Sequence, residues 1–166
     1  LKKSIVCIEP TFLSTLSERQ ILSGVAEMLK IALVCDFELF EKMIQLSPLE
    51  IGQNKEYINK CIKLKQSVVK RDPFDKNYRH ILNFGHSIGH ALESIAMKKG
   101  EDLLHGEAVA SGMYYTLGLC KNLSSKTTNR ILLCNLTFLL LNEETLYLFG
   151  GHTRYGWLCT PCAGSL

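Results

Sequence analysis

The sequence lacks the marks of a membrane, secreted or nucleic-acid-binding protein. No apolar run among its 166 residues reaches the ~20 that a membrane-spanning helix needs, and the stretch from Leu136 to Leu141 is interrupted by Thr137. The amino terminus, LKKSIVCIEP, has no apolar stretch long enough for a signal peptide and begins with Leu, so we expect the sequence to start inside a longer protein. The net charge is only +3, without the dense basic stripe that nucleic-acid binding needs, so a small anionic ligand fits better.

The cysteines show neither a disulfide framework nor a complete zinc-binding pattern. There are seven, at positions 7, 35, 61, 120, 134, 159 and 162. An odd, scattered number in a helical sequence indicates reduced, buried thiols of a cytoplasmic protein. Cys159 and Cys162 have the spacing of a redox or zinc pair, but only four residues follow them and a second pair is missing. A structural role is therefore favoured for them.

Strand-like alternation is rare, and helical periodicity dominates the sequence. One short strand is expected at Ser4–Ile8, ended by Pro10. The helices that spacing and capping residues predict are 18–34, 37–46 after a cap at Asp36, 54–70, 78–97, 105–119 and 143–149 after Asn142. Residues 152–166 have no period of either kind, and there is no internal repeat or low-complexity linker. The predicted fold class is mainly α.

The predicted helix at 78–97 carries an unusual polar face. Opposite its apolar stripe stand Arg79, Asn83, His86 and His90, at offsets of 0, 4, 7 and 11, where lysine and glutamate would be expected. His86 and His90 have the spacing at which two imidazoles converge on one metal ion or one substrate. From these residues alone, a pair of surface histidines with nothing bound is the alternative.

Gly85 and Gly89 in the same predicted helix favour a functional role for it. A glycine inside a helix costs up to about 1 kcal/mol against alanine, so two of them indicate a close approach of another backbone. An HxxxH pair also occurs in zinc hydrolases, which place a glutamate directly after the first histidine as general base. Here Ser87 stands in that position, which disfavours a hydrolase.

Four further polar residues fit ordinary structural roles, and two of them, His105 and Lys65, also fit a functional one. His105 begins a predicted helix, either as a surface residue or as a third nitrogen ligand folded back on His86. Glu27 and Lys30 are three residues apart, which fits a solvated salt bridge worth about 0.2–0.5 kcal/mol. Lys65 leaves an apolar stripe, so its ammonium group either reaches water along its stem or meets a buried anion.

Several of these residues fall in segments that occur together in one family. The segments are GVAEMLK at 24–30, KQSVVKRD at 65–72, RHILNFGHSIGHALE at 79–93 and LLHGEAVASGM at 103–113. In this order they resemble 3-dehydroquinate synthase and, more broadly, the sugar-phosphate cyclases. PTFLSTLSERQ at 10–20 is similar to the segment that leads from the family's nucleotide domain into its helical domain. The resemblance covers roughly residues 1 to 125 and implies a multi-helix carboxy-terminal domain.

The resemblance implies a metal site and a proton-transfer group. The family's zinc, or another divalent metal such as cobalt, is held by one glutamate and two histidines, which fall on Glu27, His86 and His105. One carboxylate and two imidazoles leave coordination positions open, as a catalytic metal requires. His90 falls on a position that faces the substrate and takes part in proton transfer.

The resemblance also implies substrate and cofactor contacts. Positions that hold substrate phosphate, carboxylate and hydroxyls fall on Lys30, Lys65, Arg79 and Asn83, and a stretch that touches NAD falls on Phe12, Leu13, Ser14 and Thr15. In the family, bound NAD oxidises a ring hydroxyl of 3-deoxy-D-arabino-heptulosonate 7-phosphate and is later regenerated. Phosphate then leaves and ring closure gives 3-dehydroquinate, in the shikimate pathway of aromatic amino acid biosynthesis.

A domain division and a set of partners follow from the same resemblance. Residues 1–16 are expected to be a remnant of the nucleotide domain and linker, 17–150 a helical metal- and substrate-binding domain, and 151–166 an atypical tail. The family's glycine-rich nucleotide domain should precede residue 1, so the chain alone is expected to be inactive. For the whole protein we expect a cytoplasmic homodimer without nucleic-acid or membrane partners.

Some positions depart from the family's pattern. Ile31 stands where the family usually has an aromatic residue or histidine, and Asp75 and Asn77 replace its usual Glu and Gly. The region EETLYLFGGHTRYGW lacks the lysines that the family carries near its end, and the sequence from about 150 onward resembles altered or frame-shifted sequence. Two alternatives therefore stay open: a related sugar-phosphate cyclase, and a non-catalytic helical remnant or interaction module.

Overall fold

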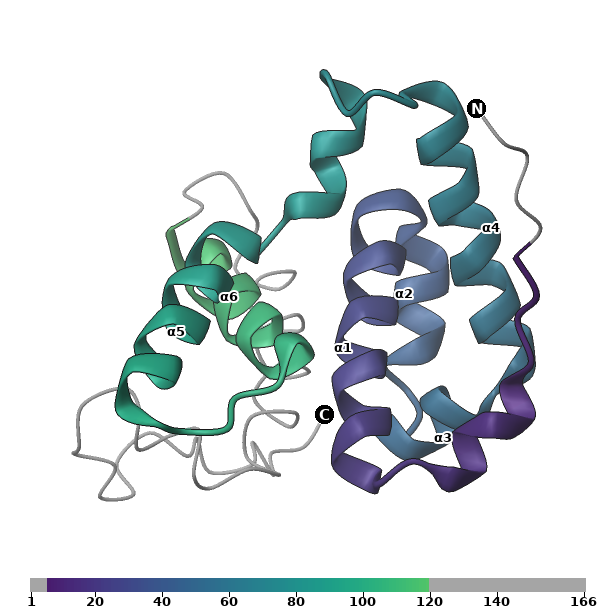
Figure 1. Cartoon of the computed structure of the whole chain (residues 1–166). Helices are drawn as coiled ribbons and strands as arrows, with labels where there is room; N and C mark the ends of the chain where they lie inside the picture. The colour runs from purple at the N-terminus through teal and green to yellow at the C-terminus, as the bar shows by residue number, and fades with distance from the viewer. Residues whose placement is uncertain (1–5, 120–166) are drawn as a thin grey trace, which may run out of the picture.

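The computed structural model describes residues 6–119, and every regular element in this part of the chain is a helix (Figure 1). The elements are the 3₁₀ helix η1 (Pro10–Thr15), α1 (Glu18–Cys35), α2 (Phe37–Met43), α3 (Pro48–Gln53), α4 (Lys55–Arg71), the 3₁₀ helix η2 (Tyr78–Asn83), α5 (His86–Lys99) and α6 (His105–Leu119). The mainly α fold class is confirmed. None of these helices combines the length and apolarity needed to cross a membrane. Outside the described residues lie the predicted helix at 143–149, the Cys159 and Cys162 pair and the tail at 151–166.

Helix α1 is the central element of this fold. It begins with a capping box, in which the Ser17 hydroxyl accepts from the Gln20 N–H and the Gln20 side chain accepts from the Ser17 N–H. Helices α2, α3 and α4 pack on one side of α1, and α6 packs on another (Figure 1). Val25, Leu29 and Ala32 of α1 are at most 1% exposed, so the hydrophobic core runs along this helix.

Most predicted helices are confirmed to within a few residues, but helix α3 has no counterpart among them. Its six residues are too few to show a helical period. The signals that start it are local: Pro48 occupies the first turn, and Ser47 and Glu50 form a second capping box. Helix α2 also ends earlier than predicted, at Met43.

The prediction of one continuous helix over 78–97 is wrong. The chain forms η2 over its first six residues, and α5 begins only at His86. Between the two, Gly85 has a φ of +79°, a left-handed conformation that an α-helix cannot contain. Arg79 and Asn83 therefore lie on a different segment from the two histidines, and the four residues do not form one stripe.

The glycines of this region bring α5 against α6. A Cβ built on Gly85 would lie 2.7–2.8 Å from atoms of Met113 and Val109, and one on Gly89 would lie 3.1–3.3 Å from the backbone of Ala108 and Val109. Contacts this short leave almost no room for a side chain. The prediction that these glycines mark a close approach of another backbone is confirmed, and the partner is α6.

Two smaller predictions need correction. Val6–Ile8 form no strand, and the rest of that predicted strand lies outside the described residues. Cys61 is buried as expected, but Cys7 is exposed. Burial raises the pKa of the Cys61 thiol to about 11, so this sulfur stays protonated at neutral pH and is a poor nucleophile.

Alanine substitutions at two glycines should change stability in opposite directions. Gly85→Ala should lower the free energy of unfolding by more than about 1 kcal/mol, because an L residue is strained at this φ and its Cβ would collide with α6. Gly24 is the matched control, since it lies inside α1 and a Cβ there would meet nothing within 4 Å. Gly24→Ala should raise the free energy of unfolding by about 0.5–1 kcal/mol. Urea denaturation followed by circular dichroism measures both, and equal effects would contradict the role given to Gly85.

Asp72 organises the turn that leads from α4 into η2. Its carboxylate accepts hydrogen bonds from the backbone N–H groups of Asn77, Lys76 and Arg79, at 2.8, 3.1 and 3.1 Å. These bonds favour the ionised form and lower the pKa of Asp72 to about 2. One carboxylate thus sets the path of the chain into the segment that carries Arg79.

The stabilisation from Asp72 should depend on pH. Because its folded-state pKa of about 2 lies below the ordinary value of 3.8, the contribution is complete above pH 3.8 and is lost as the pH falls through 2. Asp72→Asn should therefore unfold at a lower temperature than the unaltered chain at neutral pH, and the difference should shrink toward about pH 2. Thermal unfolding across this range tests it, and a difference independent of pH would argue against the role of the charge.

Candidate functional site

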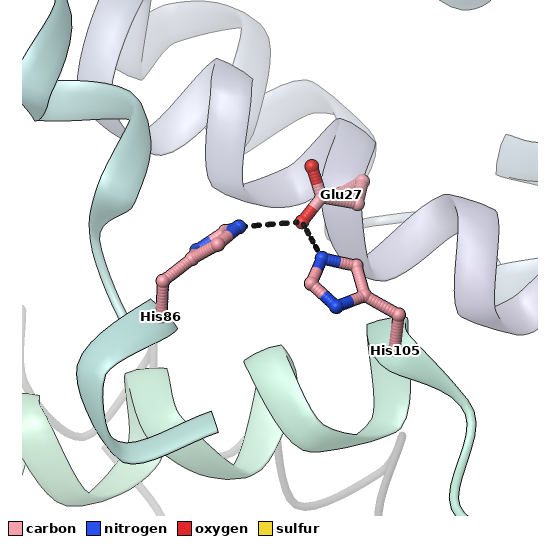
Figure 2. A group of neighbouring side chains, drawn as sticks. All are labelled: Glu27, His86 and His105. Carbon is pink, nitrogen blue, oxygen red and sulfur yellow. Dashed lines mark ion pairs between the residues drawn. The ribbon is translucent and has the colours of Figure 1, made fainter. Parts of the chain in front are cut away.

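Three side chains from three helices converge beside α1. Glu27 extends from α1, His86 is the first residue of α5 and His105 is the first residue of α6. Glu27 Oε1 lies 3.7 Å from His86 Nε2 and 3.8 Å from His105 Nε2 (Figure 2). The two imidazole rings meet edge to face, with their centroids 5.2 Å apart. The three residues predicted as metal ligands therefore lie together, each offering one donor atom within 4.8 Å of the others.

Neighbouring acceptors orient both imidazoles toward Glu27. His86 Nδ1 lies 3.3 Å from the Phe84 carbonyl oxygen, and His105 Nδ1 lies 3.1 Å from Glu93 Oε1. A carbonyl and an ionised carboxylate only accept hydrogen bonds, so each Nδ1 carries a proton and donates it. In a neutral imidazole this leaves a lone pair on Nε2, the atom that faces Glu27. Metal-binding histidines are typically held by such an outer hydrogen bond.

Glu27 Oε1 is buried and has no hydrogen-bond partner in the described part of the chain. Neither Nε2 atom can be that partner, because each is too distant, at 3.7 and 3.8 Å, and presents a lone pair. An unpaired buried carboxylate oxygen is costly, and three electron-rich atoms facing one another repel. A divalent cation removes both problems, since donor atoms about 2.0–2.2 Å from one zinc ion lie roughly 3–4 Å apart. The donor set fits such a cation.

Lys30 binds the other oxygen of Glu27. The Nζ to Oε2 distance is 2.7 Å and the lysine side chain is only 4% exposed, so the solvated salt bridge that spacing alone suggests is wrong. Burial lowers the pKa of Lys30. The hydrogen bond and the negative charge of Glu27 oppose this shift, and repulsion from Lys65 adds to it. Lys65 itself is exposed, so its ammonium group reaches water near this site. Burial, with repulsion from Lys30, also lowers the pKa of His86, which favours the neutral form that metal binding requires.

Contacts between α1 and α6 hold His105 in position. Arg19 in the first turn of α1 donates two hydrogen bonds to the Glu107 carboxylate, at 2.6 and 2.8 Å. The Gly106 N–H donates to Ser23 Oγ at 3.0 Å. A Cβ on Gly106 would overlap the Ser23 carbonyl oxygen, so glycine is needed for α6 to start this close to α1. The first residue of α6 is thereby fixed beside the helix that carries the carboxylate.

His90 completes a cluster of three imidazoles. It lies one turn after His86 on α5, with ring centroids 5.5 Å from His86 and 5.8 Å from His105. Its Nδ1 lies 2.7 Å from Glu93 Oε2. Although burial opposes the effect, the hydrogen bonds from His90 and His105 lower the pKa of Glu93. An ionised carboxylate therefore bridges one predicted metal ligand and the predicted proton-transfer residue.

Arg79 and Asn83 do not join this cluster by side-chain contact. Both lie on η2, where Asn83 is exposed and Arg79 is partly buried. Within residues 6–119, neither side chain forms a hydrogen bond or ion pair with Glu27 or a histidine. Their assignment to substrate binding stays a prediction.

The four residues predicted to contact NAD form most of η1. Phe12 is 72% exposed, and the Thr15 hydroxyl donates to the Phe12 carbonyl at 2.8 Å. Leu13 and Ser14 line an open pocket of about 590 Å³ together with residues of α1 and α3, and none of the three metal donors lines it. This pocket is therefore separate from the metal donors, and the cofactor contact stays a prediction.

The residues that orient the donors are those that sequence reasoning overlooks. Glu93 follows His90 by three residues, a spacing of helical neighbours that could have drawn attention to it. Arg19 and Ser23 carry no local signal, because they meet α6 across 88 and 83 residues of sequence. Only the packed structure makes them partners of the site.

Comparison with known proteins gives a consistent set of relatives. Residues 24–138 match the family described as 3-dehydroquinate synthase C-terminal. The 3-dehydroquinate synthase of Thermoanaerobacter pseudethanolicus is 42% identical over 123 residues, covering 72% of this chain and 34% of that protein. Those of Alkaliphilus metalliredigens and Enterococcus faecalis are 38% and 41% identical, covering 71% and 65% of this chain and 34% and 30% of the relatives. The chain spans about a third of the length of the curated relatives it matches.

Proposed function

We propose, because this chain belongs to the 3-dehydroquinate synthase family, that it forms the metal-binding part of a carbon–oxygen lyase. Glu27, His86 and His105 hold one divalent cation, zinc or a similar metal such as cobalt. One observation carries the proposal: the buried Glu27 Oε1 lacks a hydrogen-bond partner in the described residues and faces two Nε2 atoms at 3.7 and 3.8 Å. A hydrolytic role has no such support, since Ser87 stands where a general base would be needed.

The reaction that we infer converts 3-deoxy-D-arabino-heptulosonate 7-phosphate to 3-dehydroquinate with release of phosphate, a step of the shikimate pathway. The metal, when bound, acts as a Lewis acid toward substrate oxygens. Lys30 and Lys65 repel each other, so an anionic phosphate or carboxylate between them is stabilised by both. Arg79 and Asn83 on η2 add a guanidinium and an amide for the same ligand.

His90 is the residue that we assign to proton transfer. Its Nδ1 is engaged by Glu93 at 2.7 Å, which leaves the lone pair of a neutral imidazole on Nε2. That nitrogen can take a proton from the substrate and return it. The exposed position of this side chain, beside the rings of His86 and His105, suits contact with a ligand that enters from solvent.

NAD is the second cofactor under this proposal, with a contact at Phe12, Leu13, Ser14 and Thr15. Residues 1–166 contain no Gly-x-Gly-x-x-Gly turn to hold its pyrophosphate. We therefore place dinucleotide binding in a part of the protein that corresponds to the unmatched length of the relatives. A homodimer in the cytoplasm, without nucleic-acid or membrane partners, stays a prediction for the whole protein.

Single substitutions should separate metal ligands from their neighbours. Glu27→Gln, His86→Asn and His105→Asn should each weaken zinc binding by more than about 100-fold, because losing a ligand exceeds the 10–100-fold effect of losing an outer partner. His90→Asn should bind zinc almost as well as the unaltered chain. Competition with a chromophoric chelator measures the affinities. An unaltered chain without measurable zinc affinity would support the non-catalytic remnant instead.

The chain by itself should not complete the reaction. Purified residues 1–166, supplied with NAD, zinc and 3-deoxy-D-arabino-heptulosonate 7-phosphate, should release no inorganic phosphate, because the sequence contains no Gly-x-Gly-x-x-Gly turn for the NAD pyrophosphate. An assay for inorganic phosphate measures the release. The full-length 3-dehydroquinate synthase of Thermoanaerobacter pseudethanolicus is the positive control. Zinc-dependent release that disappears in Glu27→Gln would show that this expectation is wrong.

A further inference from the structure

Glu93 is an acidic residue that contacts the site but binds neither the metal nor the substrate in the function proposed above. It lies on α5 and its side chain is 29% exposed. Each of its carboxylate oxygens meets a different histidine, with Oε2 2.7 Å from His90 Nδ1 and Oε1 3.1 Å from His105 Nδ1. Glu93 is thus hydrogen-bonded both to a metal donor and to the proton-transfer residue.

This arrangement determines the tautomers of both rings. An ionised carboxylate has acceptors and no donor, so the hydrogen of each bond comes from Nδ1. A neutral imidazole has one N–H, and placing it on Nδ1 leaves the lone pair on Nε2. For His105, Nε2 is the atom that faces Glu27 Oε1 at 3.8 Å. For His90, Nε2 is the atom available to a ligand.

We propose that Glu93 is a positioning residue that holds His90 and His105 in the Nδ1–H tautomer at the same time, presenting one Nε2 lone pair to the metal and the other to the substrate. The proposal rests on the function proposed above for the metal identity, but the tautomers are a property of the metal-free chain. It joins metal affinity and proton transfer through one carboxylate.

Glu93, His90 and His105 could also be taken as a second metal site, because their donor atoms lie within 4.8 Å of one another. The hydrogen bonds argue against it. Both oxygens of Glu93 already accept hydrogen bonds from Nδ1 atoms, at 2.7 and 3.1 Å, whereas Glu27 Oε1 is buried without a partner in the described residues. The cation therefore belongs at Glu27, and Glu93 orients the rings.

The tautomers can be measured directly in the metal-free chain. Histidine labelled with ¹⁵N gives separate signals for protonated and unprotonated ring nitrogens, and His90→Asn and His105→Asn assign them. In the unaltered chain both rings should show Nδ1–H. Glu93→Ala should remove this preference from both rings, and Glu93→Gln, which offers one accepting oxygen, from at least one. Retention of Nδ1–H by both rings in Glu93→Ala would overturn the proposal.

Zinc affinity provides the second readout. Glu93→Ala should weaken zinc binding by about 10–100-fold, the effect typical of an outer partner. Glu93→Asp separates charge from reach: it keeps the charge but is too short to hold both rings, so it should also weaken binding. Wild-type affinity in Glu93→Asp would mean that the charge acts without positioning, and would overturn the proposal.

Controls separate this proposal from the function on which it rests. Glu101→Ala removes an exposed acidic residue just beyond α5 and should change neither readout. Thermal unfolding in the presence of a chelator shows whether each variant is folded, and Glu93→Gln, which keeps the side-chain volume, replaces Glu93→Ala if the latter is not. If Glu27→Gln binds zinc normally, the metal site fails while the tautomer result stands. If Glu27→Gln loses zinc binding while the Glu93 variants behave like the unaltered chain in both readouts, the positioning role fails and the metal site stands.

Discussion

Glu27 Oε1 is the atom on which the rest of this site depends. A buried polar atom without a partner costs about 1–3 kcal/mol, and more when it carries charge, so its surroundings need an explanation. Here two imidazole nitrogens are turned toward it because the opposite ring nitrogens donate hydrogen bonds to the Phe84 carbonyl and to the Glu93 carboxylate. The lone pairs of both Nε2 atoms therefore face an oxygen that already carries negative charge. Three such atoms form a cage that suits a cation.

The fold supports this cage through very short distances between helices. Helix α1 contributes the carboxylate from an element packed against α2, α3, α4, α6 and η2, so the oxygen has little freedom. Helices α5 and α6 each contribute a histidine at their first residue, where no preceding turn of helix covers the ring. Gly85 and Gly89 let α5 and α6 touch, and Gly106 lets α6 touch α1. Larger residues at these three positions would move donor atoms apart.

Sequence reasoning predicts the helices well where they are long. The core-facing residues of α1 and α4 repeat over four or more turns, so their periods are clear, whereas α3 has only six residues and depends on its capping box. The break at Gly85 is hidden in the sequence, because the apolar residues Ile81, Phe84, Ile88 and Leu92 keep a helical spacing across it. In the structure the φ of +79° at Gly85 divides this segment into η2 and α5.

For the site, the sequence alone shows which residue types are unusual but not which of them meet. Glu27, His86 and His105 are far apart along the chain, and their grouping came from a family resemblance rather than from any spacing. The same holds for the Arg19 contact with Glu107, which is a long-range contact of packed helices. By contrast Glu93 and His90 are helical neighbours, so that pair is open to local reasoning.

The buried contact of Lys30 with Glu27 affects the electrostatic balance of the whole cluster. With both lysines protonated and the imidazoles neutral, the carboxylates of Glu27 and Glu93 are offset by the ammonium groups of Lys30 and Lys65. Without a cation the cluster is electroneutral and exerts little long-range pull on an anion. A divalent ion gives it a surplus of two positive charges. Under the proposed function, this cluster therefore attracts an anion more strongly with its ion than without it.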